Sequence, residues 1–148
     1  DIIMAITYTN VIYEKVIDNL HTILADEFNI AILYDDTSDR PNQSFLVTPV
    51  SDSLDSQLTT GSVREYTINI NYQIDFGGNY TKNSIKQVSL VAERIKRLIK
   101  NNENYTVSSE RQWHNAMVNN IEYSRNDDDS NLLEANIEAS FKVMEIIS

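Results

Sequence analysis

The chain has 148 residues, a length at which a single core buries about 70% of the surface of the unfolded chain. It contains no cysteine, which excludes disulfides, thiol nucleophiles and cysteine zinc sites. The net charge of −10 argues against nucleic-acid binding by the surface as a whole, because phosphate contacts require clustered lysine and arginine. Apolar runs are far shorter than the roughly 20 residues that span a bilayer, so we expect one soluble domain over residues 1–148, without membrane contact.

The first periodic segment runs from Asn10 to Phe28 and predicts an amphipathic helix. Its apolar residues recur at spacings of three and four, as on one buried helical face. They are Ile12, Val16, Leu20, Ile23, Leu24 and Phe28. The short apolar run from Ile30 to Tyr34 then predicts a strand, and Asp35 to Asn42 a turn.

The middle of the chain predicts two strands joined by a long loop. Gln43 to Val50 is predicted as a strand that ends near Pro49, because proline cannot donate a hydrogen bond to a sheet. The polar residues from Ser51 to Ser62 show no period and predict a loop, of the kind that often carries function in compact domains. Glu65 to Phe76 alternates strictly between apolar and polar residues, which predicts a strand with one buried face.

The last third of the chain predicts a helix followed by strands. A second amphipathic helix is predicted from Asn83 to Lys100, and a short strand from Tyr105 to Ser108. Met117 to Tyr123 and Leu133 to Val143 alternate and predict a hairpin that turns at Arg125 to Asn131. The order of elements predicts an α+β fold, in which a mainly antiparallel sheet carries two amphipathic helices on one face.

The polar residues do not indicate a catalytic or cofactor site. His21 and His114 do not stand at spacings typical of metal ligands or of a catalytic triad. The run Asp127, Asp128 and Asp129 lacks the alternating acids, glycine and distant glutamate of a calcium loop, which favours a solvated hairpin turn. With three glycines, the chain has no glycine-rich phosphate loop. We therefore expect a protein that is not an enzyme and holds no metal ion or cofactor.

Positive charge is concentrated in the second predicted helix. Between positions 82 and 100, six basic residues and the single acid Glu93 give +5, which leaves −15 for the rest of a chain whose total is −10. A basic helix on an acidic body can attract another copy of the same protein; the alternative is a solvated helix face. The candidate subunit-interface residues are Lys82, Lys86, Arg94, Lys96, Arg97 and Lys100.

Tyrosine is the most frequent aromatic residue, with eight Tyr against four Phe and one Trp. It is enriched at protein interfaces because it joins a large apolar body to a polar end. Tyr66 and Tyr72 lie in the alternating strand, where packing in the sheet is favoured. Tyr80 and Tyr105, which border the second helix among Asn and Thr, are added to the interface candidates.

This order of elements resembles that of the tail terminator proteins of tailed bacteriophages. The likeness is carried by the helix Tyr13-Glu14-Lys15-Val16-Ile17-Asp18-Asn19-Leu20, the strand from Glu65 to Phe76 and the helix from Asn83 to Lys100, and it covers most of the chain. The resemblance implies a virion protein of the tail or neck, assembled in the host cytoplasm into a ring, typically of six subunits. Such a ring ends the tail tube at its head-proximal side, stops its polymerisation and joins it to the head connector.

The implied partners are other copies of the chain, the tail tube protein and the head connector protein, without sequence-specific nucleic acid. Two segments, the predicted loop and the predicted hairpin turn, are long enough to reach neighbouring rings. Their candidate contact residues are Leu54, Leu58, Arg125, Asp127, Asp128 and Asp129. The alternatives are a head-closure or other connector subunit, and a non-viral adaptor or ligand-binding domain.

Overall fold

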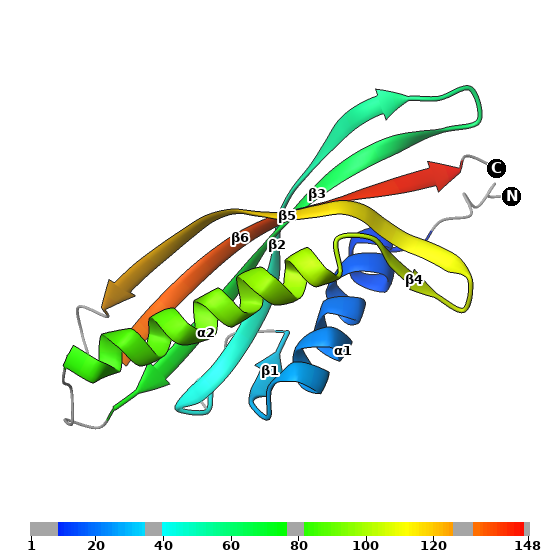
Figure 1. The fold of residues 1–148 in the computed structure, drawn as a ribbon. Coiled ribbons are helices and arrows are strands. Elements are labelled where there is room, and N and C mark those ends of the chain that lie inside the picture. Colours follow the sequence, from blue (N-terminus) through cyan, green and yellow to red (C-terminus); the bar gives the residue numbers. More distant parts are fainter. Residues whose placement is uncertain (1–8, 35–39, 77–81, 126–131, 147–148) are drawn as a thin grey trace, which may run out of the picture.

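The computed structural model describes residues 9–34, 40–76, 82–125 and 132–146. It is a curved six-stranded sheet that carries helices on one face (Figure 1). The helices are η1 (Ile12–Ile17), which continues directly into α1 (Asp18–Glu27), and α2 (Lys82–Asn101). The strands are β1 (Ala31–Leu33), β2 (Gln43–Gln57), β3 (Gly61–Asp75), β4 (Tyr105–Val107), β5 (Glu110–Arg125) and β6 (Leu132–Ile146).

The sheet is mixed, with the strand order β1-β2-β3-β6-β5-β4. Within the described part of the chain, β1 is parallel to β2, and the other neighbouring strands are antiparallel. The predicted α+β fold, with a mainly antiparallel sheet and two helices, is therefore confirmed in outline. The strand predicted from Ile30 to Tyr34 is present as β1, but its parallel pairing with β2 was not predicted.

The first helix begins with a π-helical stretch. At its junction with α1, the backbone N–H of Asp18 donates to the carbonyl of Tyr13, five residues earlier, where an α-helix would use the fourth. The neighbouring residues Val16 and Ile17 are both fully buried. The apolar spacing thus predicted a helix at the right place, and the wider turn lets two adjacent side chains face the core.

The predicted loop from Ser51 to Ser62 is wrong, because these residues extend two strands. β2 continues to Gln57, and β3 begins at Gly61 after a tight turn in which the Leu58 N–H donates to the Gly61 carbonyl at 2.8 Å. Two register shifts, the first just after Pro49, let β2 continue past the proline. The sequence shows no period here because every residue from 49 to 60 is exposed to water, so neither face needs apolar residues.

The strand predicted at Met117 to Tyr123 is also longer than expected. β5 starts at Glu110, and its pairing with β6 is interrupted between His114 and Met117. Within this irregularity, Asn115 has a φ of 51°, a left-handed conformation that Asn tolerates better than most residues. The shift breaks the alternation of side chains, which is why the sequence pattern revealed only the second half of the strand.

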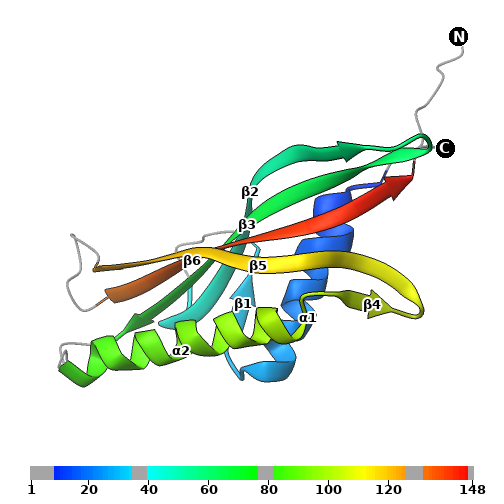
Figure 2. The same cartoon turned by 45° about the horizontal axis from the view of Figure 1, so that its top comes forward.

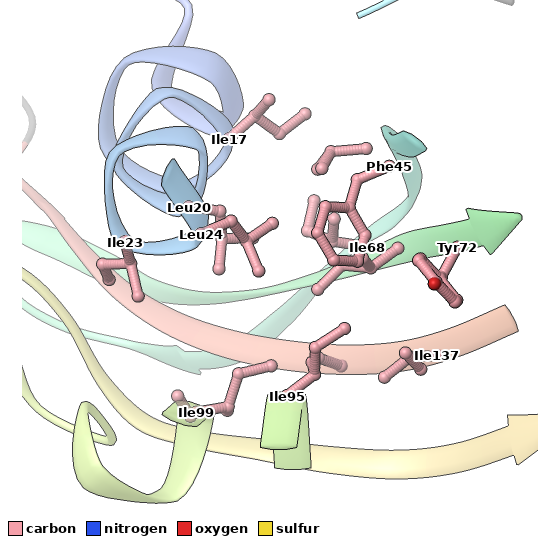
Figure 3. Packing of buried hydrophobic residues seen from close by; sticks show 14 of the residues in the cluster. Ile17, Leu20, Ile23, Leu24, Phe45, Ile68, Tyr72, Ile95, Ile99 and Ile137 are labelled. Atoms are coloured by element: carbon pink, nitrogen blue, oxygen red, sulfur yellow. The ribbon is translucent and has the colours of Figure 1, made fainter. Parts of the chain in front are cut away.

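The core lies between the helices and the apolar face of β3 and β6. In β3, Ile68 and Ile70 have no exposed surface, and their partners across the strand pair are Ala139 and Ile137. Small alanine side chains on β6 leave room for the larger side chains of the helices. Figure 3 shows both helices directing apolar side chains to this face, namely Ile17, Leu20, Ile23 and Leu24 from the first helix and Ile95 and Ile99 from α2.

The opposite face of the sheet is polar and carries a hydrogen-bonded network. The guanidinium of Arg40 donates to the Asn71 side-chain oxygen at 2.7 Å and to the Ser44 hydroxyl at 2.8 Å. The Asn71 amide in turn donates to the Asn136 side-chain oxygen at 2.9 Å. Ser44 and Asn71 are buried, so these bonds satisfy polar groups that would otherwise destabilise the fold.

Replacing Ile70 by Ala is expected to lower the free energy of unfolding by about 2–5 kcal/mol, because it leaves a cavity between the sheet and the helices. Urea denaturation followed by circular dichroism measures the change. Leu90→Ala, an exposed position on α2, is the matched control and should change stability by less than about 0.5 kcal/mol. Equal effects of the two substitutions would contradict the described core.

Candidate assembly surfaces

The exposed flank of α2 carries the predicted basic residues, but they are not equivalent. Arg94 is engaged within the chain: its guanidinium donates to the Glu27 carboxylate at 2.7 Å and to the Glu27 carbonyl at 3.1 Å. The same guanidinium lies 4.3 Å from the centre of the Phe28 ring. Arg94 therefore fastens α2 to the end of α1, a contact within one molecule. The side chain of Lys82 lies outside the described residues.

Three further cations, Lys96, Arg97 and Lys100, line a groove between α2 and β5. The groove has a volume of about 510 Å³ and extends over residues 115–118 of β5. Lys96 pairs with Glu93 at 2.7 Å, and Lys100 with Glu103 at 3.5 Å. Exposed pairs of this kind contribute at most about 1 kcal/mol, so either lysine can exchange its partner for another carboxylate. For Arg97, the described residues provide no ion-pair partner.

The second half of β2 and the start of β3 form an arm that projects beyond the helices (Figure 1). Leu54 and Leu58, predicted to contact partners from a loop, lie on this arm and are 52% and 38% exposed. Val50, earlier on the same strand, is also exposed. These three apolar side chains have no core to enter, so they are available to another surface.

Two ion pairs hold the arm in an extended shape. Asp52 accepts from Arg64 at 2.8 Å on the face of the sheet that carries the helices. Asp55 pairs with Lys142 of β6 at 3.3 Å, and the register places Lys142 on the opposite face. Because one pair joins β2 to β3 and the other joins β2 to β6, the arm is braced on both sides.

The other end of the sheet carries a shallow apolar cleft of about 210 Å³ between α2, β5 and β6. Ile85 is 50% exposed at its edge, and Tyr123 of β5 is 49% exposed. Leu133 forms part of the lining. Arg125, a predicted contact residue, also lines the cleft and is engaged in an interaction within the chain.

The remaining candidate contact residues are two tyrosines and the run of three aspartates. Tyr105 is half-buried and stacks on Trp113, with ring centres 4.8 Å apart, so much of its ring packs within the chain. Tyr80 and the run Asp127, Asp128 and Asp129 lie outside the described residues. Their roles stay predictions.

His21 and His114 are both partly buried. His21 stacks on Tyr34 at 4.0 Å between ring centres, and burial lowers its pKa although Asp18 partly opposes the shift. The pKa of His114 is also lowered, first by burial and then by the neighbouring cations. Over the ranges that the structure describes, no three His, Asp or Glu residues are grouped to hold a metal ion, and no helix has the length and apolarity needed to cross a membrane.

Comparison with known proteins gives a structural likeness at low sequence identity. No protein-family model and no curated protein matches the chain. Among solved structures, it is similar to a chain of the virion of a native gene transfer agent (GTA) particle, with 12% identity and a TM-score of 0.49. The likeness covers 90% of this chain and 92% of that chain. At this identity and TM-score, the likeness assigns no function to the present chain.

Replacing Arg94 by Gln is expected to lower the free energy of unfolding by roughly 1 kcal/mol, because the exposed ion pair with Glu27 and the contact with Phe28 are both lost. Thermal or urea denaturation measures the loss. Lys86→Gln removes the same charge from the same helix, without a described ion-pair partner, and is expected to have little effect. If both variants were equally stable, Arg94 would not fasten α2 to α1.

Replacing His21 by Asn is expected to flatten the dependence of stability on pH below about 6.5. Burial lowers the pKa of His21 in the folded chain below its ordinary value of 6.5, so the unfolded chain binds the proton more readily. The wild type therefore loses stability as the pH falls from 6.5 through the lowered pKa. Urea denaturation between pH 7 and pH 5 checks this, and identical pH profiles of the two proteins would contradict it.

Proposed function

We propose that the chain is a non-enzymatic structural protein of a virion, a tail terminator that acts as a ring of subunits, typically six. The ring would sit in the tail or neck, at the head-proximal end of the tail tube. It would stop polymerisation of the tube protein and join the tube to the head connector protein. The resemblance in the order of elements supports this function, and the surfaces of the folded chain support the formation of a ring.

The observation that carries the proposal is the cationic groove of Lys96, Arg97 and Lys100 on a chain that is otherwise strongly acidic. Arg97 has no ion-pair partner in the described part of its own chain, and the two lysines have only exposed ones. Cations gathered in a groove attract a surface of opposite charge, which another copy of the same chain supplies.

The exposed side of the first helix is the acidic surface that we assign to this contact. Glu14, Asp18 and Asp26 are all exposed along it. In the described residues, Glu14 and Asp26 have no ion-pair partner, whereas Asp18 accepts a hydrogen bond from Tyr34 at 2.8 Å. A contact between two different surfaces of the same protein continues from subunit to subunit and closes into a ring when the rotation between neighbours allows it.

The elongated sheet also offers separate surfaces to the other proposed partners. The arm with Leu54 and Leu58 lies at one end of the sheet, and Arg125 lies at the other. A tail terminator must contact the tube below and the connector above it, and an elongated sheet offers candidate contact residues at both of its ends.

Replacing Arg97 by Glu is expected to weaken self-association at least tenfold, because it puts a negative charge opposite the acids of the neighbouring subunit. Native mass spectrometry or light scattering over a concentration series measures the assembly. Arg111→Glu makes the same change in net charge at an exposed position on β5 and should assemble like the wild type. Wild-type assembly should also weaken as salt rises, since salt screens exposed charges.

A second readout addresses the tail terminator function itself. Wild-type protein added to the tail tube protein of its own virus should give shorter tubes in electron micrographs, and the Arg97→Glu variant should not. A protein that stays monomeric at high concentration and leaves tube length unchanged would overturn the proposal in favour of an adaptor or ligand-binding domain.

A further inference from the structure

The projecting arm exposes apolar side chains that its own molecule cannot cover. Residues 49 to 60 are exposed on both faces, and Leu54 and Leu58 lie near and at the tip. The start of β3 in the arm also pairs with the end of β6, but the exposed apolar side chains of the arm have no layer packed against them, so they gain from a partner surface. The Asp52–Arg64 and Asp55–Lys142 pairs hold the arm in shape before it binds.

The cleft at the opposite end of the sheet is complementary to this tip. It is lined by apolar side chains from three elements, with Ile85 from α2, Tyr123 from β5 and Leu133 from β6. Its volume of about 210 Å³ gives room for a leucine side chain. Arg125 and Glu134, of opposite charge, both border the cleft, so its complementarity to the tip lies in the apolar side chains.

The arm and the cleft of one molecule cannot meet. Gly61 starts β3 at the turn of the arm, whereas Ile74, near the other end of β3, pairs with Leu133 of the cleft. These residues are thirteen positions apart, and at roughly 3.4 Å per residue they lie about 44 Å apart along the strand. Figure 2 shows the arm and the α2 end of the sheet at opposite ends of the molecule.

The geometry points to docking of the arm of one copy in the cleft of a second copy, with Leu58 and Leu54 as the inserted side chains. The inference deepens the proposed function and rests on its self-association. The contact is again between two different surfaces, so it repeats from subunit to subunit. Unlike the cationic groove, it is mainly apolar, and high salt should therefore leave it in place.

Disulfide trapping tests the docking directly, because the chain has no cysteine of its own. Mixing Leu58→Cys protein with Ile85→Cys protein under mild oxidation should give a covalent dimer, since a disulfide requires Cα atoms within about 7 Å. Val107→Cys, at an exposed position of β4, replaces Ile85→Cys in the control mixture and should give little dimer. Absence of the dimer, or equal yields in the two mixtures, would overturn the docking.

A second variant separates this inference from the proposed function. Leu58→Asp alters an exposed residue in a turn, so the fold should be retained, and the dissociation constant should rise at least tenfold at high salt. If wild-type rings form, but the Leu58→Cys and Ile85→Cys mixture gives no dimer and Leu58→Asp leaves the dissociation constant unchanged, the docking is wrong and ring formation stands. If the dimer forms between chains that never close a ring or shorten tubes, the docking stands and the tail terminator function is wrong.

Discussion

The shared apolar face of β3 and β6 is the contact on which the rest of the structure depends. Ile68 and Ile70 face alanine and isoleucine partners on β6, and both helices pack against this one stripe. The opposite face is polar and cannot bury a helix. Because both helices must lie on the same side, α2 comes to lie against the end of α1, which brings Arg94 to Glu27. The ion pair is a consequence of the apolar layer, which supplies most of the favourable free energy of folding.

The strands are longer than the layer of helices that covers them. β2, β3 and β6 each have 15 residues, and the uncovered length becomes the projecting arm. A short sheet would have hidden its apolar residues under the helices. Here Leu54 and Leu58 stay in water, on an arm whose Asp52 and Asp55 form ion pairs with Arg64 of β3 and Lys142 of β6. The same excess of length thus links the architecture of the fold to the surfaces from which an assembly can be built.

Two kinds of surface follow from the fold, and they differ in physical character. The groove of Lys96, Arg97 and Lys100 is electrostatic and sensitive to salt, whereas the arm and the cleft are mainly apolar. In our proposal, each kind of surface contacts a second copy of the chain. Electrostatic attraction would then bring the subunits together quickly and in register, and apolar burial would keep them together in a ring.

The sequence by itself determined the helices and strands whose buried residues recur at a regular spacing. It also determined the concentration of positive charge on α2. Spacings of three and four located both helices, and alternation located β3 and β6, since a buried face imposes its period on the chain. Only the tertiary structure decided that residues 51–57 form a strand. Both faces of this strand are exposed to water, so its sequence does not have to alternate between apolar and polar residues. It also decided that Arg94 is engaged with Glu27, which is 67 residues away in sequence and becomes a neighbour only when the two helices share one face. Among the described residues, Arg97 has no ion-pair partner.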